Sequence, residues 1–114
     1  MTKSKSDDQR LSPQGFESAA ECLRTLAHPT RLRMIELLLD AEYSVGELAE
    51  RCRLSPSHAS THLGRMRDRG LLQVELRGRE RYYTVAEPAL AGILHCVRAR
   101  FGRKRPKSTS RKGK

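Results

Sequence analysis

The sequence lacks the features that mark several large classes of protein. It has no apolar run of roughly 18 residues and no signal-peptide pattern, so we expect a cytoplasmic protein with no membrane partner. Its cysteines, Cys22, Cys52 and Cys96, form no CxxC pair, which argues against a disulfide framework and fits a reducing compartment. It also has no carboxylate pair, no nucleophile beside a base and no phosphate-cradling glycine loop, so we do not expect an enzyme.

The positive charge is unevenly placed. The chain carries a net charge of +10, of which +7 lies in residues 102–114 and +1 in residues 1–13, leaving +2 for residues 14–101. We interpret residues 1–13 as a disordered N-terminal arm and residues 102–114 as a basic disordered tail. Residues 14–101 contain no lysine, and their cations are arginines, which suit phosphate and guanine.

Residues 55–70 have the borders of a helix with one polar face. Ser55 is a suitable N-cap, Pro56 suits the first helical position, and Gly70 suits a left-handed stop. Spacing i, i+4, i+7 predicts one buried stripe, and the opposite face carries small polar groups that fit a DNA major groove. The buried stripe is Ala59, Leu63 and Met66; the polar face is Ser57, Thr61, Gly64 and Asp68, flanked by Ser60, His58 and Arg65. A solvated helix face is the alternative for this helix taken alone.

The segments on either side complete a recognisable unit. Ser44 and Glu47 form a capping box that starts a short helix, so residues 44–70 read as helix, tight turn, helix. After Gly70, residues 71–76 and 81–85 are β-prone runs joined by a turn with Gly78, which predicts a hairpin. Its tip carries Arg77, Arg79 and Arg81, which a hairpin that only closes the core would not need. The whole is predicted to be a winged helix.

The outer helices carry more apolar surface than a core of this size can absorb. Residues 16–27 and 88–101 each form an apolar stripe, and a chain of 114 residues builds only a modest core. We therefore predict a homodimer joined through its first and last helices. A helix over residues 30–39 lies between, with Leu32, Ile35 and Leu39 inward. Arg31 and Arg33 lie near its start, against the helix dipole, and either a phosphate or a carboxylate such as Glu36 explains them.

The motifs resemble those of the ArsR/SmtB family of bacterial winged-helix repressors. The matching segments are Leu26–Ile35, Ser44–Ala49, Leu54–Leu63, Gly70–Leu72, Arg77–Arg79 and Tyr82–Tyr83. The resemblance implies a mainly α fold with a small β-hairpin, in the order α-α-α-α-β-β-α over residues 14–101. It also implies a bacterial, nucleoid-associated homodimer that occupies an imperfect palindromic double-stranded DNA operator until an inducer releases it. The family places Ser57, Ser60, Thr61 and His62 on the DNA-reading helix. Our full set of expected DNA contacts is Ser55, Ser57, His58, Ser60, Thr61, His62, Arg65, Arg77, Arg79 and Arg81.

The chain departs from the family's known sensor sites, so no metal site is assigned. Tyr43–Glu47 lacks the paired cysteines of arsenic sensors, and Ile35–Leu37 lacks the cysteine of persulfide sensors. Cys22 and Cys96 sit on the same side of their helices and form a possible thiol sensor, although two inert interface cysteines fit equally well. Cys52 reads as a core residue. The inducer is thus a metal, a metalloid or a thiol signal, if there is one. A winged-helix protein-interaction module and a DNA binder with no inducer site remain alternatives.

Overall fold

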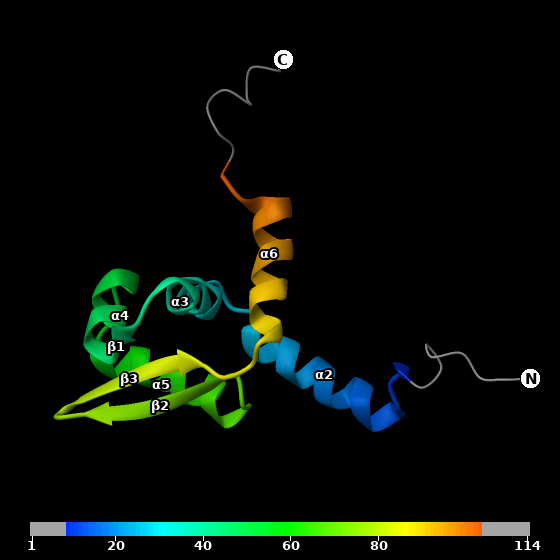
Figure 1. The fold of residues 1–114 in the computed structure, drawn as a ribbon, viewed down its shortest axis with the longest axis horizontal. Helices are drawn as coiled ribbons and strands as arrows, with labels where there is room; N and C mark the ends of the chain where they lie inside the picture. The colour runs from blue at the N-terminus through cyan, green and yellow to red at the C-terminus, as the bar shows by residue number, and fades with distance from the viewer. Residues whose placement is uncertain (1–8, 104–114) are drawn as a thin grey trace, which may run out of the picture.

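The structure, a computed structural model, describes residues 9–103. Residues 1–8 of the predicted arm and residues 104–114 of the predicted basic tail lie outside this range. The fold is mainly helical with a small antiparallel sheet, as predicted (Figure 1). Its elements are α2 (Pro13–Leu26), α3 (Pro29–Asp40), β1 (Tyr43–Ser44), α4 (Val45–Cys52), α5 (Pro56–Asp68), β2 (Leu72–Arg77), β3 (Glu80–Val85) and α6 (Ala89–Phe101).

The predicted helix borders of the helix-turn-helix are confirmed. Ser44 Oγ accepts from the Glu47 N–H at 3.1 Å while the Glu47 carboxylate accepts from the Ser44 N–H at 2.8 Å, which completes the capping box of α4. Ser55 Oγ accepts from the His58 N–H at 3.2 Å and caps α5, whose first residue is Pro56. Gly70 has φ +78° directly after α5, a conformation that glycine adopts without strain.

The sheet has a strand that the sequence did not predict. Tyr43 and Ser44 form β1, which pairs antiparallel with Tyr83 and Tyr82 of β3, so the expected two-stranded hairpin is a three-stranded sheet in the order β1-β3-β2. A two-residue strand has no periodicity to reveal it. The hairpin itself is confirmed, with Gly78 at φ +64° in its turn. The added strand ties the hairpin to the start of α4.

The first helix differs from its prediction in two ways. It begins at Pro13, within the segment interpreted as the arm, because Ser12 Oγ accepts from the Gly15 N–H at 3.0 Å and caps it. Its buried residue is Leu26 at its end, whereas Phe16 and Leu23, which the predicted stripe also includes, are 62% and 55% exposed. The protomer therefore uses only the end of α2 for its own core.

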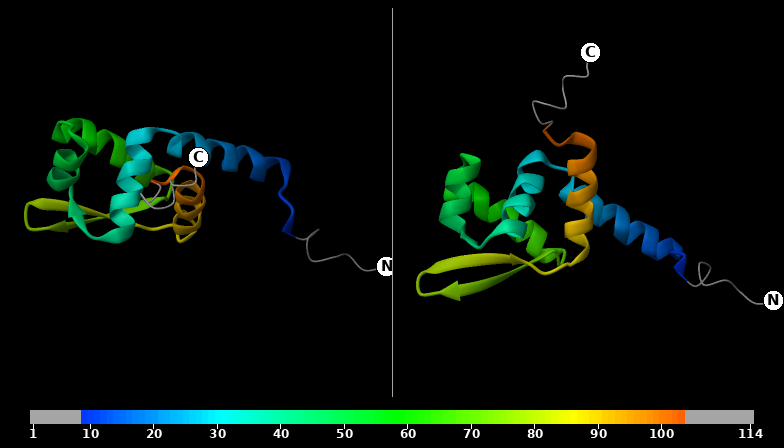
Figure 2. Two further views of the ribbon diagram at one scale, coloured as in Figure 1. Left: turned by 90° about the horizontal axis from the view of Figure 1, so that it is seen from above. Right: turned by 45° about the horizontal axis from the view of Figure 1, so that its top comes forward.

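The core is centred on α3. This helix buries Met34, Ile35 and Leu38, so the expected inward positions Leu32 and Leu39 are only partly buried. The reason is that α3 contacts α4, β3 and α6, which surround it on more than one side. α2 and the tip of the β2–β3 hairpin project in opposite directions from this core (Figure 2). No helix within residues 9–103 has the length and apolar character needed to cross a bilayer.

Candidate nucleic-acid interface

The two faces of α5 are separated as the sequence predicts. Ala59, Leu63 and Met66 have no exposed surface. On the opposite side Ser57 and Thr61 are exposed, and the Thr61 hydroxyl donates to the Ser57 carbonyl at 3.1 Å. Of the remaining predicted contacts on α5, His58 and Arg65 are exposed and Ser60 is half-buried. Ser55 is exposed as well, but its hydroxyl is already engaged as the cap.

A hollow of ≈ 400 Å³ lies between the start of α5 and the hairpin tip. Its walls combine small or hydroxyl-bearing residues of two helix N-termini with the charged residues of the tip. The lining residues are Ser44, Val45, Gly46, Pro56, Ser57, Ser60, Arg79, Glu80 and Arg81. The structure therefore brings predicted reading residues and predicted wing arginines to one surface. Ser44, Val45 and Gly46 at the start of α4 were not among the expected DNA contacts, and they also line the hollow. Backbone N–H groups at the start of a helix are of the kind that bind phosphate, and those of Ser44 and Glu47 are engaged in the capping box.

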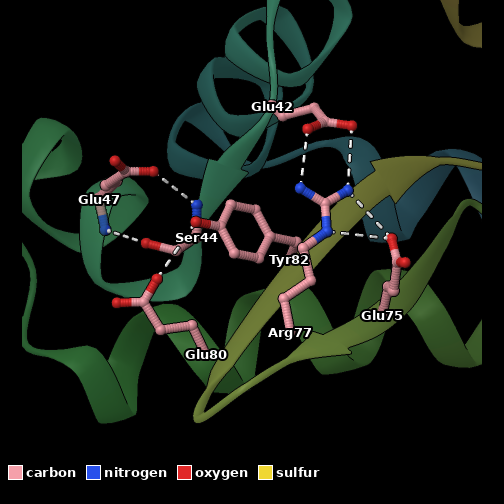
Figure 3. A network of polar contacts seen from close by, with 7 residues as sticks. All are labelled: Glu42, Ser44, Glu47, Glu75, Arg77, Glu80 and Tyr82. Carbon is pink, nitrogen blue, oxygen red and sulfur yellow. Dashed lines mark hydrogen bonds and ion pairs between the residues drawn. The ribbon is translucent and has the colours of Figure 1, made fainter.

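Arg77 is held by carboxylates (Figure 3). Its guanidinium donates to both oxygens of Glu42, at 2.9 and 3.1 Å, and to Glu75 at 3.0 Å. It also lies over the Tyr82 ring, 4.4 Å from the centroid. Hydrogen bonding to Arg77, with its charge, lowers the pKa of Glu42, and the pKa of Arg77 is raised by its bonds to Glu42 and Glu75. Its charge is thus compensated within the protomer, and it joins the hairpin to the loop after α3.

Arg79 and Arg81 differ from Arg77. Both are exposed, and neither forms an ion pair with another residue in the described part of the chain. The nearby Glu80 accepts from the Tyr82 hydroxyl at 3.2 Å, which raises the pKa of that tyrosine. Among the three predicted wing arginines, these two keep their charge available to an external anion.

His62 is turned partly into the protein. Its Nδ1 accepts from Arg31 Nε at 3.1 Å, and its ring lies 4.6 Å from that of His28. Burial and the neighbouring charges of His28, Arg31, His58 and Arg65 lower its pKa from the ordinary 6.5. A neutral ring is required for Nδ1 to accept this hydrogen bond. His62 is therefore less accessible than the exposed His58 and Arg65 on the same helix.

The cysteines are free thiols in three different environments. Cys22 on α2 is half-buried against the core, and Cys96 on α6 is exposed. Cys52 packs partly against the core, as expected, and burial raises the pKa of its thiol. Residues 9–103 contain no cluster of three or more His, Cys, Asp or Glu side chains suited to a metal ion.

The sequence does not reveal the partners that orient two of the arginines. Glu42 precedes Arg77 by 35 residues, and Arg31 precedes His62 by 31. Separations of this length carry no local periodicity, so only the three-dimensional fold brings these groups together. The sequence did contain one signal for such a partner. Arg31 is a cation at the start of a helix, the end at which the helix dipole disfavours positive charge.

The lowered pKa of His62 predicts a loss of stability at acid pH. The unfolded chain takes up this proton near pH 6.5 and the folded chain only below that, so the His62 contribution is complete above about pH 6.5 and is lost as the pH falls through the folded pKa. Between about pH 8 and about pH 5 the Tm of the wild type should fall more steeply than that of His62→Gln, whose amide oxygen still accepts from Arg31. Parallel curves of Tm against pH for the two proteins would contradict a lowered pKa of His62.

Comparison with known proteins places the chain in a family. Residues 28–74 match the model described as bacterial regulatory protein, arsR family. The chain is 37% identical over 84 residues to an uncharacterized HTH-type transcriptional regulator of Mycobacterium tuberculosis, Rv0081, covering 73% of this chain and 74% of that one. The crystal structure of Rv0081 superposes with a TM-score of 0.71 at 35% identity, covering 82% of this chain and 93% of that one.

Two further proteins extend the comparison. The transcriptional repressor PagR of Bacillus anthracis is 33% identical over 88 residues, covering 76% of this chain and 88% of that protein. The solution structure of the homodimeric winged helix-turn-helix domain of Mb0332 from Mycobacterium bovis has a TM-score of 0.68 at 25% identity, covering 74% and 78% of the two chains. Together with the capped α4–α5 unit and its β-hairpin, these matches show that the chain belongs to the ArsR family and is a DNA-binding transcriptional regulator, not an enzyme.

Proposed function

We propose that the protein is a homodimeric repressor that binds an imperfect palindromic operator through residues 14–101. Each subunit places α5 in a major groove, and the two grooves are successive along one side of the duplex. The observation that carries this proposal is the shared hollow, in which Ser57 and Ser60 of α5 face the same space as Arg79 and Arg81 of the hairpin. A repressor is favoured because PagR, a relative of similar length, is named as one.

The groups around the hollow divide into two kinds of contact. Hydroxyl groups on α5 suit base edges, where each contact depends on the base presented. Arg79, Arg81 and the backbone N–H groups at the start of α4 suit phosphates, which position the protein without reading sequence. Arg77 is left out of this contact set, since Glu42 and Glu75 already compensate its charge.

Substitutions on the two sides of the hollow should therefore have different effects. Ser60→Ala should weaken binding to the operator several-fold and leave binding to unrelated DNA unchanged. Arg79→Gln should weaken binding to all sequences alike and reduce the slope of log affinity against log salt by about one. Arg33→Gln is the matched control, since it also removes one arginine but lies outside the hollow, where it donates to the Arg51 carbonyl at 3.2 Å, so the slope should be unchanged.

Fluorescence anisotropy titrations at several salt concentrations provide the measurement. The operator is first obtained by selecting bound fragments from random DNA. Unchanged affinity in both Ser60→Ala and Arg79→Gln would rule out this docking. Failure of the wild type to select any sequence would instead favour a winged-helix module that contacts proteins.

The proposed dimer interface lies on α2 and α6. Phe16 and Leu23 of α2 and Phe101 of α6 are 62%, 55% and 74% exposed, large apolar side chains left outside the protomer's core. Burying such surface is the main favourable term in association. The domain of Mb0332, which superposes on this fold, is described as homodimeric, and this supports a homodimer here.

A charge placed in this surface should dissociate the dimer. Leu23→Asp should shift the protein from dimer to monomer in sedimentation equilibrium, with its helical circular dichroism retained, because the side chain lies outside the core. Leu76→Asp is the matched control: Leu76 on β2 is 67% exposed but lies away from α2 and α6, so the dimer should persist. A dimer that survives Leu23→Asp would contradict the assignment of this interface.

We propose Cys22 and Cys96 as the sensing thiols, because they lie on α2 and α6, the helices assigned to the interface. The thiol oxidant diamide should then release wild-type protein from DNA, and Cys22→Ser or Cys96→Ser should abolish this release. Cys52→Ser should leave it intact, since a partly buried thiol with a raised pKa reacts slowly. A wild type that stays bound in diamide would contradict a thiol sensor.

A further inference from the structure

Arg31 has no carboxylate partner in the described part of the chain. The sequence left a phosphate or Glu36 as explanations for this cation at the start of α3. The structure removes the carboxylate, because Glu36 accepts from Arg98 of α6 at 2.9 Å. Arg31 instead donates from Nη1 to the Thr25 carbonyl at 2.9 Å and from Nε to His62 at 3.1 Å. These bonds fix the guanidinium without compensating its charge.

A second uncompensated arginine lies beside it. Arg65 of α5 is exposed and forms no ion pair with any residue from 9 to 103. It follows His58 and His62 at spacing i, i+4, i+7, so these residues share the edge of α5 that faces Arg31. Burial, and then the positive charge of Arg65, lower the pKa of Arg31.

The two arginines line a hollow of ≈ 250 Å³ together with Thr25, Asp68 and Arg69. The charges of Asp68 and Arg69 are already paired, with Arg67 at 3.3 Å and with Glu21 at 2.7 Å. The uncompensated charge in the hollow is therefore that of Arg31 and Arg65. Holding two guanidinium groups together has an electrostatic cost that a bound anion removes. Phosphate matches the geometry of the guanidinium fork.

We propose that Arg31 and Arg65 form a phosphate clamp that binds one phosphodiester group of the DNA strand at the edge of the groove occupied by α5. This inference rests on the proposed function and extends it to α3, which contributes no residue to the hollow beside the hairpin. It also assigns Arg65, one of the expected DNA contacts on α5, to the phosphate backbone. Arg31 is preorganised for this role by Thr25 and His62.

The clamp makes a specific prediction about salt dependence. Because the two arginines share one phosphate, Arg65→Gln and Arg31→Gln should each reduce the slope of log affinity against log salt by at most about one, equally on operator and unrelated DNA. Arg33→Gln is the matched control, because Arg33 lies on the same helix but outside the hollow. Its guanidinium donates to the Arg51 carbonyl at 3.2 Å. The slope for Arg33→Gln should equal that of the wild type.

Two further measurements keep the test decisive. If Arg31→Gln fails to fold, Arg31→Lys can be measured in its place. It retains the positive charge, so it should keep the wild-type slope. Unchanged slopes in Arg65→Gln would overturn the clamp. Stabilisation of the wild type, but not of Arg65→Gln, by inorganic phosphate with unchanged slopes would also overturn it, in favour of a free-anion site. A wild type without sequence preference contradicts the proposed operator, whereas the slope differences on unrelated DNA would still support the clamp.

Discussion

The burial of Ala59, Leu63 and Met66 orients α5, and the candidate interface depends on that orientation. All three side chains are fully buried in the core around α3. A helix that buries one stripe must present the opposite stripe to solvent, so the polar face of α5 is exposed as a consequence of packing. The same orientation turns one edge of α5 toward the hairpin and the other toward the start of α3. Both proposed phosphate-binding surfaces follow from this geometry.

Neighbouring carboxylates distinguish arginines that look alike in the sequence. Arg77 and Arg79 are two residues apart in the same hairpin, yet only Arg77 reaches Glu42 and Glu75. The exposed Arg77–Glu42 pair adds little stability in water, where such pairs are screened. Its bidentate geometry and its position over Tyr82 instead fix how the hairpin lies against the loop after α3. We interpret Arg77 as a residue that positions the hairpin.

Local patterns predicted most of the fold, because caps, glycine turns and the buried stripe of α5 are encoded within a few residues. They failed where a distant segment decides the outcome. β1 exists because β3, about 40 residues later, supplies its hydrogen bonds. Likewise the apolar pattern of α2 did not distinguish Leu26, which joins the protomer's core, from Phe16 and Leu23, which remain outside it. The charge pattern identified the wing arginines but not the carboxylates that separate Arg77 from the others.

α3 connects the proposed dimer interface to both proposed DNA-binding surfaces. It reaches α6 through Glu36–Arg98 and α5 through Arg31–His62, and the loop that follows it reaches the hairpin through Glu42–Arg77. The Glu36–Arg98 pair is about half exposed, so it is too weak to transmit a large change by itself. The stronger connection is the buried contact of α3 with α6, in a core where close packing resists gradual deformation. An inducer that repositions α6 would therefore act on α5 and the hairpin mainly through the packing of α3. The Arg31–His62 and Glu42–Arg77 contacts would then determine the positions of the side chains proposed to contact DNA.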